Sequence, residues 1–470
     1  MEVQHQPKQD EKAGLMARCG MTLADWSERW FPDAYVFALI AVAITCLGAI
    51  ALGRDPIAVA NNFGKSFWAL IPFTMQMAFI VIGGYIVAVA PPVKKLIVAI
   101  ASVPKTPRLT VAYVAFWSIA TCLISWGFGI IFAGTLMREV MKRVPGVDYR
   151  AVAAAAYVGM GSVWALGLSS SAALLMATKT SIPGSLYKIS GTIPLSLTLF
   201  TWQNLTMIVV VSTVAIWISY ASCPTAENAK TAEKAGLQFV EEKVEVSKAQ
   251  VPGEYLEHSP ILTIIIVLLG VGYLVTTFAT QGGMAALNLN IYNFIFIFAG
   301  MLLHWTPKNF LKAASKSVPM TGGVLIQFPL YAGIFGVLMG SGLNDVLARF
   351  FVSVSTQGAL PAIVGIYSAI MGLFLPSGGG KWVVEATYIL EAATQLKVNL
   401  AWMVQAYNAA EALPNFINPF WMLPLLGLTG FKARDVAGFS ILQLIFLTPV
   451  ALILLWLLGK TMPYVAPMIQ

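Results

Sequence analysis

Several apolar stretches of this chain are as long as a membrane is thick, and they constrain its fold more than any other feature. A helix of about 20 apolar residues spans the ~30 Å of a bilayer's hydrocarbon core. The stretches are Ala34–Gly53, Phe67–Ala90, Leu195–Ser219, Ile261–Ala279 and Val436–Leu458. Only 11% of the 470 residues are charged, against about 25% in a soluble domain. The sequence therefore predicts an all-α polytopic membrane protein whose surroundings are a lipid bilayer.

The basic residues predict an orientation. If the N-terminus is cytoplasmic, most of the 29 Lys and Arg residues fall on the inner side, as in membrane proteins generally. This holds only if two Gly-containing segments, Ser125–Gly129 and Pro376–Gly380, enter the membrane and turn back. The net charge of +8 then has a membrane explanation, and no nucleic-acid partner is expected. We predict a multi-pass protein of the bacterial inner membrane with a periplasmic C-terminus.

A shift of about 250 residues aligns similar features of the two halves. The aligned pairs are Gln76 with Gln327, "SWGFG" with "PSGGG", Tyr157 with Tyr407, and "LGLSSSA" with "NFINPFW". With the charge-derived topology, the halves become two inverted repeats, each with a re-entrant helical hairpin and a broken transmembrane helix. Such repeats are typical of secondary transporters. The predicted division is a cytoplasmic N-terminal segment with an interfacial helix (1–32), a first repeat (33–220), a cytoplasmic polar linker (221–259) and a second repeat (260–470).

The interruptions supply the candidate substrate-binding residues. Interrupted helix inside a membrane is tolerated only where protein or a water-filled cavity surrounds it, so the interruptions should face the protein centre. Glycine allows a positive φ and a close approach to a ligand, and the helix that begins near Lys381 offers free N–H groups to a carboxylate. The candidates are Ser125, Trp126, Gly127, Gly129, Ser169, Ser170, Ser171, Ser377, Gly378, Gly379, Gly380, Lys381, Asn415 and Asn418.

Ionisable residues within apolar segments are functional candidates, and here they are Lys381, Glu385, Glu391 and Glu411. Lys381 and Glu385 lie one helical turn apart, and two interpretations stay open: the lysine contacts the substrate or replaces a cation, or the pair lies in the outer mouth and steadies the hairpin. Glu411 is either a proton carrier or a hydrogen-bonded link between helices. Glu385 and Glu411 are thus the candidates for ion coupling. A coupling Na⁺ near Ser377 and Asn415 is the alternative to H⁺, and no other metal or cofactor is predicted.

These motifs resemble the short-chain fatty acid transporter family, the bacterial carriers of acetoacetate and butyrate-like acids. The resemblance rests on "RWFPDAYVFAL", "FWALIPFTMQMAFIV", "SSSAALLMAT", "GLFLPSGGGKWVV" and "INPFWMLPLLGLTGFKARDVAGF". It implies binding roles for Ser125–Gly129, Ser169–Ser171, Pro376–Gly380 and Asn415–Pro419. Lys381 and Glu385 depart from the neutral or weakly basic residue and the Gln that the family has there.

The sequence thus predicts a carrier, not an enzyme, that takes up short-chain fatty acids or related small carboxylates with H⁺ or Na⁺. Lys381 suggests one alternative, a carrier or exchanger of dicarboxylates or other organic anions. An anion channel or a membrane receptor is a third interpretation. The resemblance leaves a homodimer open. The tryptophans near predicted span ends are predicted as anchors at the membrane interface: Trp26, Trp30, Trp68, Trp305 and Trp402.

Overall fold

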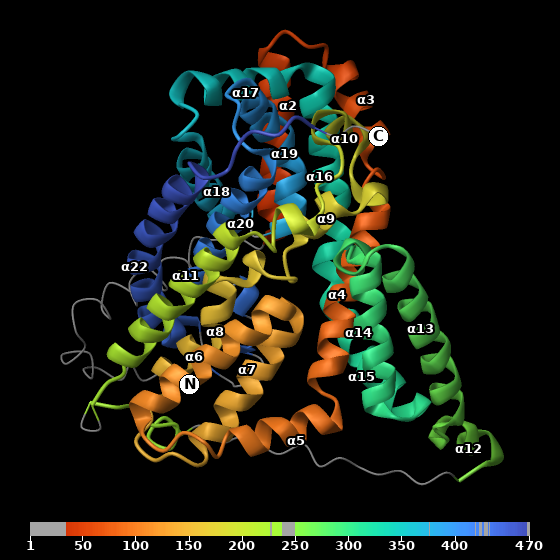
Figure 1. Ribbon diagram of the computed structural model, residues 1–470, viewed down its shortest axis with the longest axis vertical. Helices are drawn as coiled ribbons and strands as arrows, with labels where there is room; N and C mark the ends of the chain where they lie inside the picture. The colour runs from red at the N-terminus through yellow and green to blue at the C-terminus, as the bar shows by residue number, and fades with distance from the viewer. Residues whose placement is uncertain are drawn as a thin grey trace, which may run out of the picture.

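The computed structural model describes residues 34–225, 228–236, 250–375, 377–418, 420–422, 425–426, 431 and 433–467. The interfacial helix expected within residues 1–32, with Trp26 and Trp30, lies outside these ranges. The described residues form a helical bundle (Figure 1). Seven helical spans among them are long and apolar enough to cross a membrane. The prediction of an all-α polytopic membrane protein is confirmed.

The first half of the chain contains ten of the labelled α-helices. They are α2 (Ala34–Ala51), α3 (Pro56–Ser66), α4 (Ile71–Ala88), α5 (Pro91–Ile100), α6 (Pro107–Ile124), α7 (Trp126–Met141), α8 (Tyr149–Ser162), α9 (Ser171–Ala177), α10 (Gly184–Ser190) and α11 (Trp202–Ala221). A short 3-10 turn, Trp164–Leu166, lies between α8 and α9.

The second half supplies the rest of the bundle. Its helices are α12 (Pro252–His258), α13 (Ile261–Thr280), α14 (Leu289–His304), α15 (Pro307–Ser317), α16 (Gly322–Ser341), α17 (Leu343–Val354), α18 (Leu360–Phe374), α19 (Gly378–Gln395), α20 (Leu400–Ala412) and α22 (Ala433–Gly459). A 3-10 turn, Leu413–Phe416, follows α20.

The helix bounds of the two halves repeat with a constant offset. Helices α3 and α15 begin 251 residues apart (56 and 307) and end 251 residues apart (66 and 317). The same offset separates the starts of α4 and α16 and those of α8 and α20. Helices α5 and α17, which follow α4 and α16 in the chain, lie at opposite ends of the molecule (Figure 1). Opposite orientation of the halves requires such a placement, and the inversion itself stays a prediction.

All four predicted interruptions are breaks in helix. Ser125 separates α6 from α7 with an extended backbone (φ −156°, ψ 123°) and accepts a hydrogen bond from Phe128 N at 3.5 Å. Ser377 is also extended (φ −145°, ψ 97°). Helix α8 stops at Ser162, and α9 starts only after Ser170, whose hydroxyl accepts from Ala173 N at 3.1 Å. Each break coincides with a serine or proline, which competes with or removes a helical hydrogen bond.

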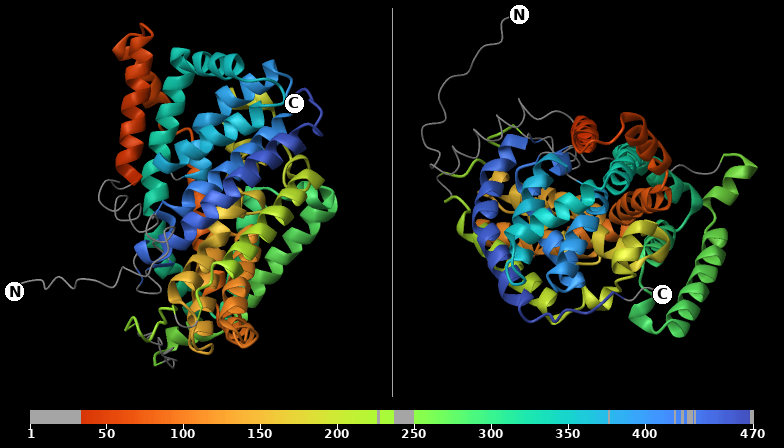
Figure 2. Two further views of the ribbon diagram at one scale, coloured as in Figure 1. Left: turned by 90° about the vertical axis from the view of Figure 1, so that its left-hand side faces the viewer. Right: turned by 90° about the horizontal axis from the view of Figure 1, so that it is seen from above.

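The outer helices expose apolar side chains on the surface that faces away from the centre of the bundle. Helices α11 and α22 pack together on one flank, and α13 forms the edge of the opposite flank (Figures 1 and 2). Leu268 and Leu269 of α13 are 64% and 67% exposed. Leucines so exposed suit contact with lipid and not with water, so this edge belongs to the bilayer-facing surface.

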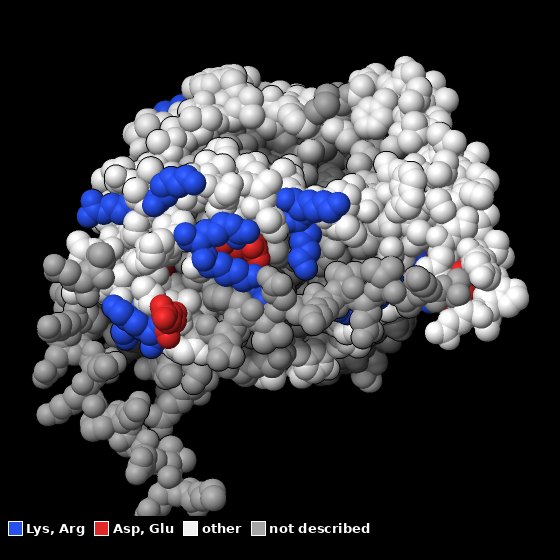
Figure 3. Space-filling view, turned by 90° about the horizontal axis from the view of Figure 1, so that it is seen from below, with Lys and Arg blue, Asp and Glu red and all other residues white. Residues whose placement is uncertain are grey.

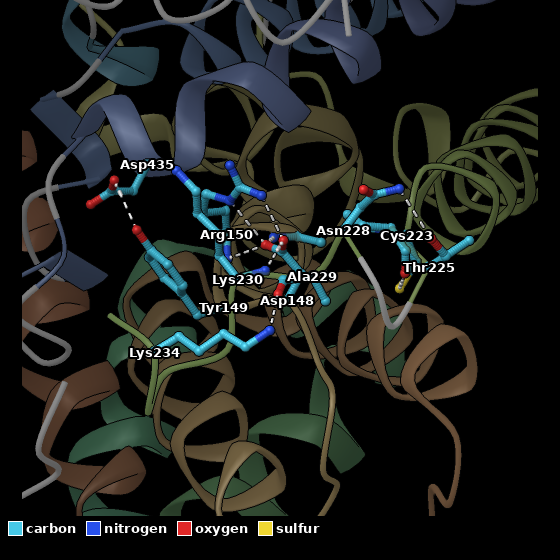
Figure 4. Close-up of polar contacts among 12 residues, drawn as sticks. Asp148, Tyr149, Arg150, Cys223, Thr225, Asn228, Ala229, Lys230, Lys234 and Asp435 are labelled. Carbon is cyan, nitrogen blue, oxygen red and sulfur yellow. Dashed lines mark hydrogen bonds and ion pairs between the residues drawn. The ribbon is translucent and has the colours of Figure 1, made fainter. Parts of the chain in front are cut away.

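Basic residues gather at the end of the molecule where α5 lies (Figure 3). A polar cluster there fixes the start of the polar linker against α8 (Figure 4). Asp148 is fully buried, caps α8 through Arg150 N (2.9 Å) and Ala151 N (3.2 Å), and accepts from Lys230 N at 3.0 Å. Its carboxylate also pairs with the Arg150 guanidinium at 2.7 Å. Tyr149 donates to Asp435 of α22 at 3.1 Å. One aspartate thus joins the linker to the helix that leads into the bundle.

Asp148→Ala should lower the free energy of unfolding by about 2 kcal/mol, because it removes a helix cap and leaves buried N–H groups without an acceptor. The measurement is the thermal midpoint of the detergent-solubilised protein. Glu257→Ala is the control, since the Glu257 side chain is 56% exposed and should leave the midpoint unchanged. Equal midpoints for the two variants would contradict this role of Asp148.

Candidate functional site

A cavity of about 670 Å³ lies where the helix interruptions meet. Each interruption contributes to its wall: Trp126 begins α7, Ser171 begins α9, Ser377 precedes α19, and Trp421 follows the break after α20. Most of the remaining wall is apolar and comes from Tyr35, Met77, Val81, Met160, Trp164, Met320, Gly322, Gly323, Val324, Ile326, Gln327, Phe328, Gly378 and Gly379. The rings of Trp126 and Trp421 meet edge to face at 4.9 Å. The cavity therefore has an aromatic, apolar wall with few polar groups.

The N-terminus of α19 is the polar end of this wall. Its first backbone hydrogen bond runs from Lys381 N to Ser377 O at 2.9 Å, so the N–H groups of Gly378, Gly379 and Gly380 precede the helix's own ladder. The Ser377 side chain makes no capping hydrogen bond. Ser377, Gly378 and Gly379 all line the cavity. A helix N-terminus with free N–H groups and a positive dipole end suits an anion.

The three glycines of α19 do not adopt a positive φ, and that part of the prediction is wrong. They lie in the first turn of the helix, where a side chain would find no room. A Cβ on Gly378 would stand 2.5 Å from Trp164 Cη2, and one on Gly379 would stand 2.5 Å from Phe73 Cζ. A Cβ on Gly380 would overlap the Tyr331 ring. The glycines thus permit close packing of aromatic side chains around the start of α19.

The two glycines of the first interruption also lack a positive φ. Gly127 and Gly129 lie within a helix, α7. A Cβ on Gly129 would stand 2.7 Å from Cys122 N, while one on Gly127 would stand an ordinary 3.5 Å from Ile80 O. Neither glycine lines the cavity, so the structure places them in helix packing.

Two of the predicted serines form hydrogen bonds with other groups of the protein. Ser169 accepts a hydrogen bond from Trp126 N at 2.6 Å and so ties one interruption to another. Ser170 donates to Asn408 Oδ1 of α20 at 3.0 Å. Ser171, by contrast, lies on the cavity wall, and a Cβ on Gly379 would stand 3.1 Å from its Cβ. Ser171 is therefore the serine of this group placed to meet a ligand.

The two predicted asparagines hold the second broken helix. Asn415 donates to Met160 O at 2.9 Å, and Asn418 donates to Leu373 O at 3.3 Å. Neither asparagine is among the residues that line the cavity. Each satisfies a backbone carbonyl of another helix, which an interrupted membrane helix requires.

Lys381 belongs to a buried charge cluster made of Lys381, Glu385, Glu411 and Ser368. The lysine is fully buried, its ammonium pairs with Glu411 and lies 3.9 Å from Glu385 Oε1, and it donates to Ser368 O at 2.6 Å. The Ser368 hydroxyl donates to Glu385 Oε2 at 2.6 Å. The predicted contact with Glu385 is thus present, but the cluster is not in an exposed mouth, and Lys381 does not line the cavity.

Sequence reasoning missed most residues of the cavity wall, and Gln327, Met160 and Trp164 are among those it missed. Gln327 was recognised only as the partner of Gln76 in the repeat. A polar residue within the apolar run "VLIQFPL" was the available signal. Met160 and Trp164 gave no such signal, because large apolar residues in a membrane helix are expected anywhere along it.

Comparisons with known proteins agree on the kind of protein. Residues 15–458 match the family described as "Short chain fatty acid transporter". A protein of Escherichia coli (strain K12) named "Putative short-chain fatty acid transporter" is 35% identical over 435 residues, which is 92% of this chain and 97% of that protein. A protein of the same name from Haemophilus influenzae is 32% identical over 94% of this chain and 100% of that protein.

Two solved structures share the fold. The YdaH transporter of Alcanivorax borkumensis, described as having an unusual topology, aligns with a TM-score of 0.58 at 14% identity over 95% of this chain and 99% of its own. MtrF of Neisseria gonorrhoeae, described with a class of antimetabolite efflux pumps, aligns with a TM-score of 0.50 at 11% identity over 95% of this chain and 98% of its own. At these identities the likeness shows a common fold alone.

Gly379→Ala should destabilise the protein by about 1–3 kcal/mol, because the added methyl group overpacks the contact with Phe73. Gly358→Ala is the matched control, since a Cβ there meets nothing within 4 Å. The two thermal midpoints in detergent make the comparison. A midpoint of Gly379→Ala equal to that of Gly358→Ala would show that the start of α19 has room for a side chain.

Proposed function

The chain belongs to the short-chain fatty acid transporter family, and on that premise we propose that it is a secondary active carrier for the uptake of short-chain fatty acids or related small carboxylates. One observation supports this most: the free N-terminus of α19 faces a cavity whose other walls are mostly apolar and aromatic. A short-chain fatty acid has the matching parts, an anionic head and a short apolar tail.

The proposed binding mode follows from those parts. The carboxylate accepts hydrogen bonds from the N–H groups of Gly378 and Gly379 and from the Ser377 hydroxyl, and the positive end of the α19 dipole offsets its charge. The tail packs against Trp126 and Trp164. Charge-assisted hydrogen bonds hold the head, and burial of the apolar tail adds about 0.8 kcal/mol per methylene.

A monocarboxylate fits this cavity better than the dicarboxylate suggested by Lys381. A second carboxylate would need a second cationic or donor-rich place. The Lys381 ammonium is already paired with Glu411 and lies near Glu385. Withdrawing it from those partners would leave buried carboxylates without compensation, at a cost of several kcal/mol.

The buried charge cluster supports coupling to protons. It holds one ammonium between two carboxylates, so one negative charge lacks a partner within the cluster when all three groups are ionised. Burial disfavours such a charge, and proton uptake by Glu411 or Glu385 removes it. The ammonium also occupies the space between carboxylates that a coupling Na⁺ would need. We therefore place the coupling proton on these two glutamates.

Na⁺ coupling is the second candidate, and it rests on one atom. Asn415 Oδ1 is buried and has no hydrogen-bond partner within the part of the chain that the structure describes. A side-chain amide oxygen can serve as a ligand of a hard cation. The transport assay below separates the two ions.

The basic end of the molecule sets the proposed orientation. We place the face shown in Figure 3 on the cytoplasmic side of the bacterial inner membrane, because Lys and Arg are retained on that side. Transport then alternates the access of the cavity between the two sides of the membrane, as in other carriers with interrupted helices.

Proteoliposomes that contain the protein should accumulate labelled butyrate when an inward proton gradient is imposed, and a protonophore should abolish the accumulation. A panel of C2–C6 mono- and dicarboxylates, with pH and Na⁺ varied independently, identifies the substrate and the ion. Passive equilibration that no gradient drives would instead indicate a channel. Accumulation that needs Na⁺ and ignores pH would contradict the proton assignment.

Glu411→Gln should lose proton-driven accumulation at least tenfold while keeping butyrate exchange between the two sides, because the amide cannot release a proton and Lys381 retains Glu385. Glu391→Gln is the control on α19, where Glu391 accepts from Asn344 at 2.7 Å outside the cluster. If Glu411→Gln accumulates butyrate as fast as the control, Glu411 does not carry the coupling proton.

A further inference from the structure

We infer that Gln327 of α16 binds the substrate carboxylate through its side-chain N–H₂ group, and that Tyr331 is the positioning residue that turns this group toward the cavity. The inference rests on the proposed function and deepens it, because it adds a binding residue outside the interrupted segments and a reason why a neutral site prefers a carboxylate.

Gln327 is a buried amide with one end occupied. Its side chain is part of the cavity wall, and the residue is 7% exposed. Its Oε1 accepts a hydrogen bond from the Tyr331 hydroxyl at 3.1 Å, one turn along the same helix. Within the described residues, Nε2 has no protein hydrogen-bond acceptor. Because Tyr331 occupies the oxygen, the amide's two N–H donors are left for the cavity.

Gln76 occupies the corresponding place in the first half of the chain, and its side-chain amide is hydrogen-bonded entirely within the protein. It lies in α4, 251 residues before Gln327, and α4 and α16 begin at the same offset. Its Oε1 accepts from Ser181 at 2.7 Å, and its Nε2 donates to Asn290 Oδ1 at 2.6 Å. Both ends of Gln76 are satisfied by the protein, and it does not line the cavity. The two glutamines therefore share a place in the helix order but differ in two respects: Gln327 lines the cavity, and its amide N–H₂ group is free.

Tyr331 connects Gln327 to the proposed anion site. Helix α16 packs against α19, and the Tyr331 ring fills the space that a Cβ on Gly380 would take. The same Cβ would stand 2.9 Å from Ser377 Oγ. Tyr331 and Ser377 thus border one glycine in the first turn of α19. The residue that orients Gln327 is in contact with the turn whose N–H groups face the cavity.

This arrangement gives the carboxylate donors on two sides. One oxygen meets the start of α19 and Ser377, and the other meets Gln327 Nε2. All these donors are neutral, so recognition depends on the number and direction of hydrogen bonds and not on a cationic side chain. A carboxylate can accept from all of them, whereas an uncharged ester or amide with the same tail accepts fewer and leaves a buried donor unsatisfied. The inferred ligand class is therefore a small monocarboxylate anion.

The test compares butyrate transport by proteoliposomes of the wild type, Gln327→Met, Gln327→Glu and Tyr331→Phe, each with its thermal midpoint in detergent. Gln327→Met keeps the length of the side chain without its donor and should raise KM for butyrate about tenfold. Gln327→Glu should raise it further through repulsion between two carboxylates. Tyr331→Phe should raise KM severalfold and leave the maximal rate near the wild-type value.

Gln76→Met is the matched control. It removes two satisfied hydrogen bonds away from the cavity, so it should lower the thermal midpoint and leave KM unchanged. A KM of Gln327→Met within twofold of the wild type, or a KM effect of Gln76→Met as large as that of Gln327→Met, would overturn the inference. In either result, wild-type uptake of butyrate would still support the proposed function. Wild-type vesicles that take up no carboxylate of the panel would overturn both.

Discussion

The structure depends on how the backbone polar groups at four helix interruptions are satisfied inside an apolar bundle, where each unpaired group costs several kcal/mol. Some of these backbone groups are hydrogen-bonded by a side chain of another interruption. Ser169 accepts from Trp126 N, and Asn415 donates to Met160 O. The start of α19 is different, because its free N–H groups and the Ser377 hydroxyl border a cavity. The place where the protein leaves donors unused is the place where we propose that an anion binds.

The same helix joins the proposed anion site to the proposed proton site. Gly378 and Gly379 stand on the cavity wall, while Lys381, at the end of the same turn, and Glu385, one turn further on, belong to the buried charge cluster with Glu411. A change of charge in the cluster and the arrival of a carboxylate therefore act on one rigid element. This provides a physical basis for coupling, since each event alters the electrostatic potential at the other site.

The sequence predicted the local features of the fold well and the long-range contacts of the site poorly. Apolar runs and Gly, Pro or Ser interruptions are read from neighbouring residues, so the spans and the breaks were predictable. The role of the α19 glycines was not, because it depends on Phe73, Trp164 and Tyr331, which lie far away in the chain. Trp402 was wrongly predicted as an interfacial anchor: it is fully buried, and its indole donates to Leu455 O at 3.2 Å.

The most direct test of the central claim is a structure of the protein bound to 4-bromobutyrate, in which anomalous scattering locates the bromine and the density locates the carboxylate. We predict the carboxylate within hydrogen-bond distance of the Gly378 and Gly379 N–H groups, and the bromine against the aromatic wall near Trp126 and Trp164. A carboxylate bound to Lys381, or a ligand outside this cavity, would contradict the account.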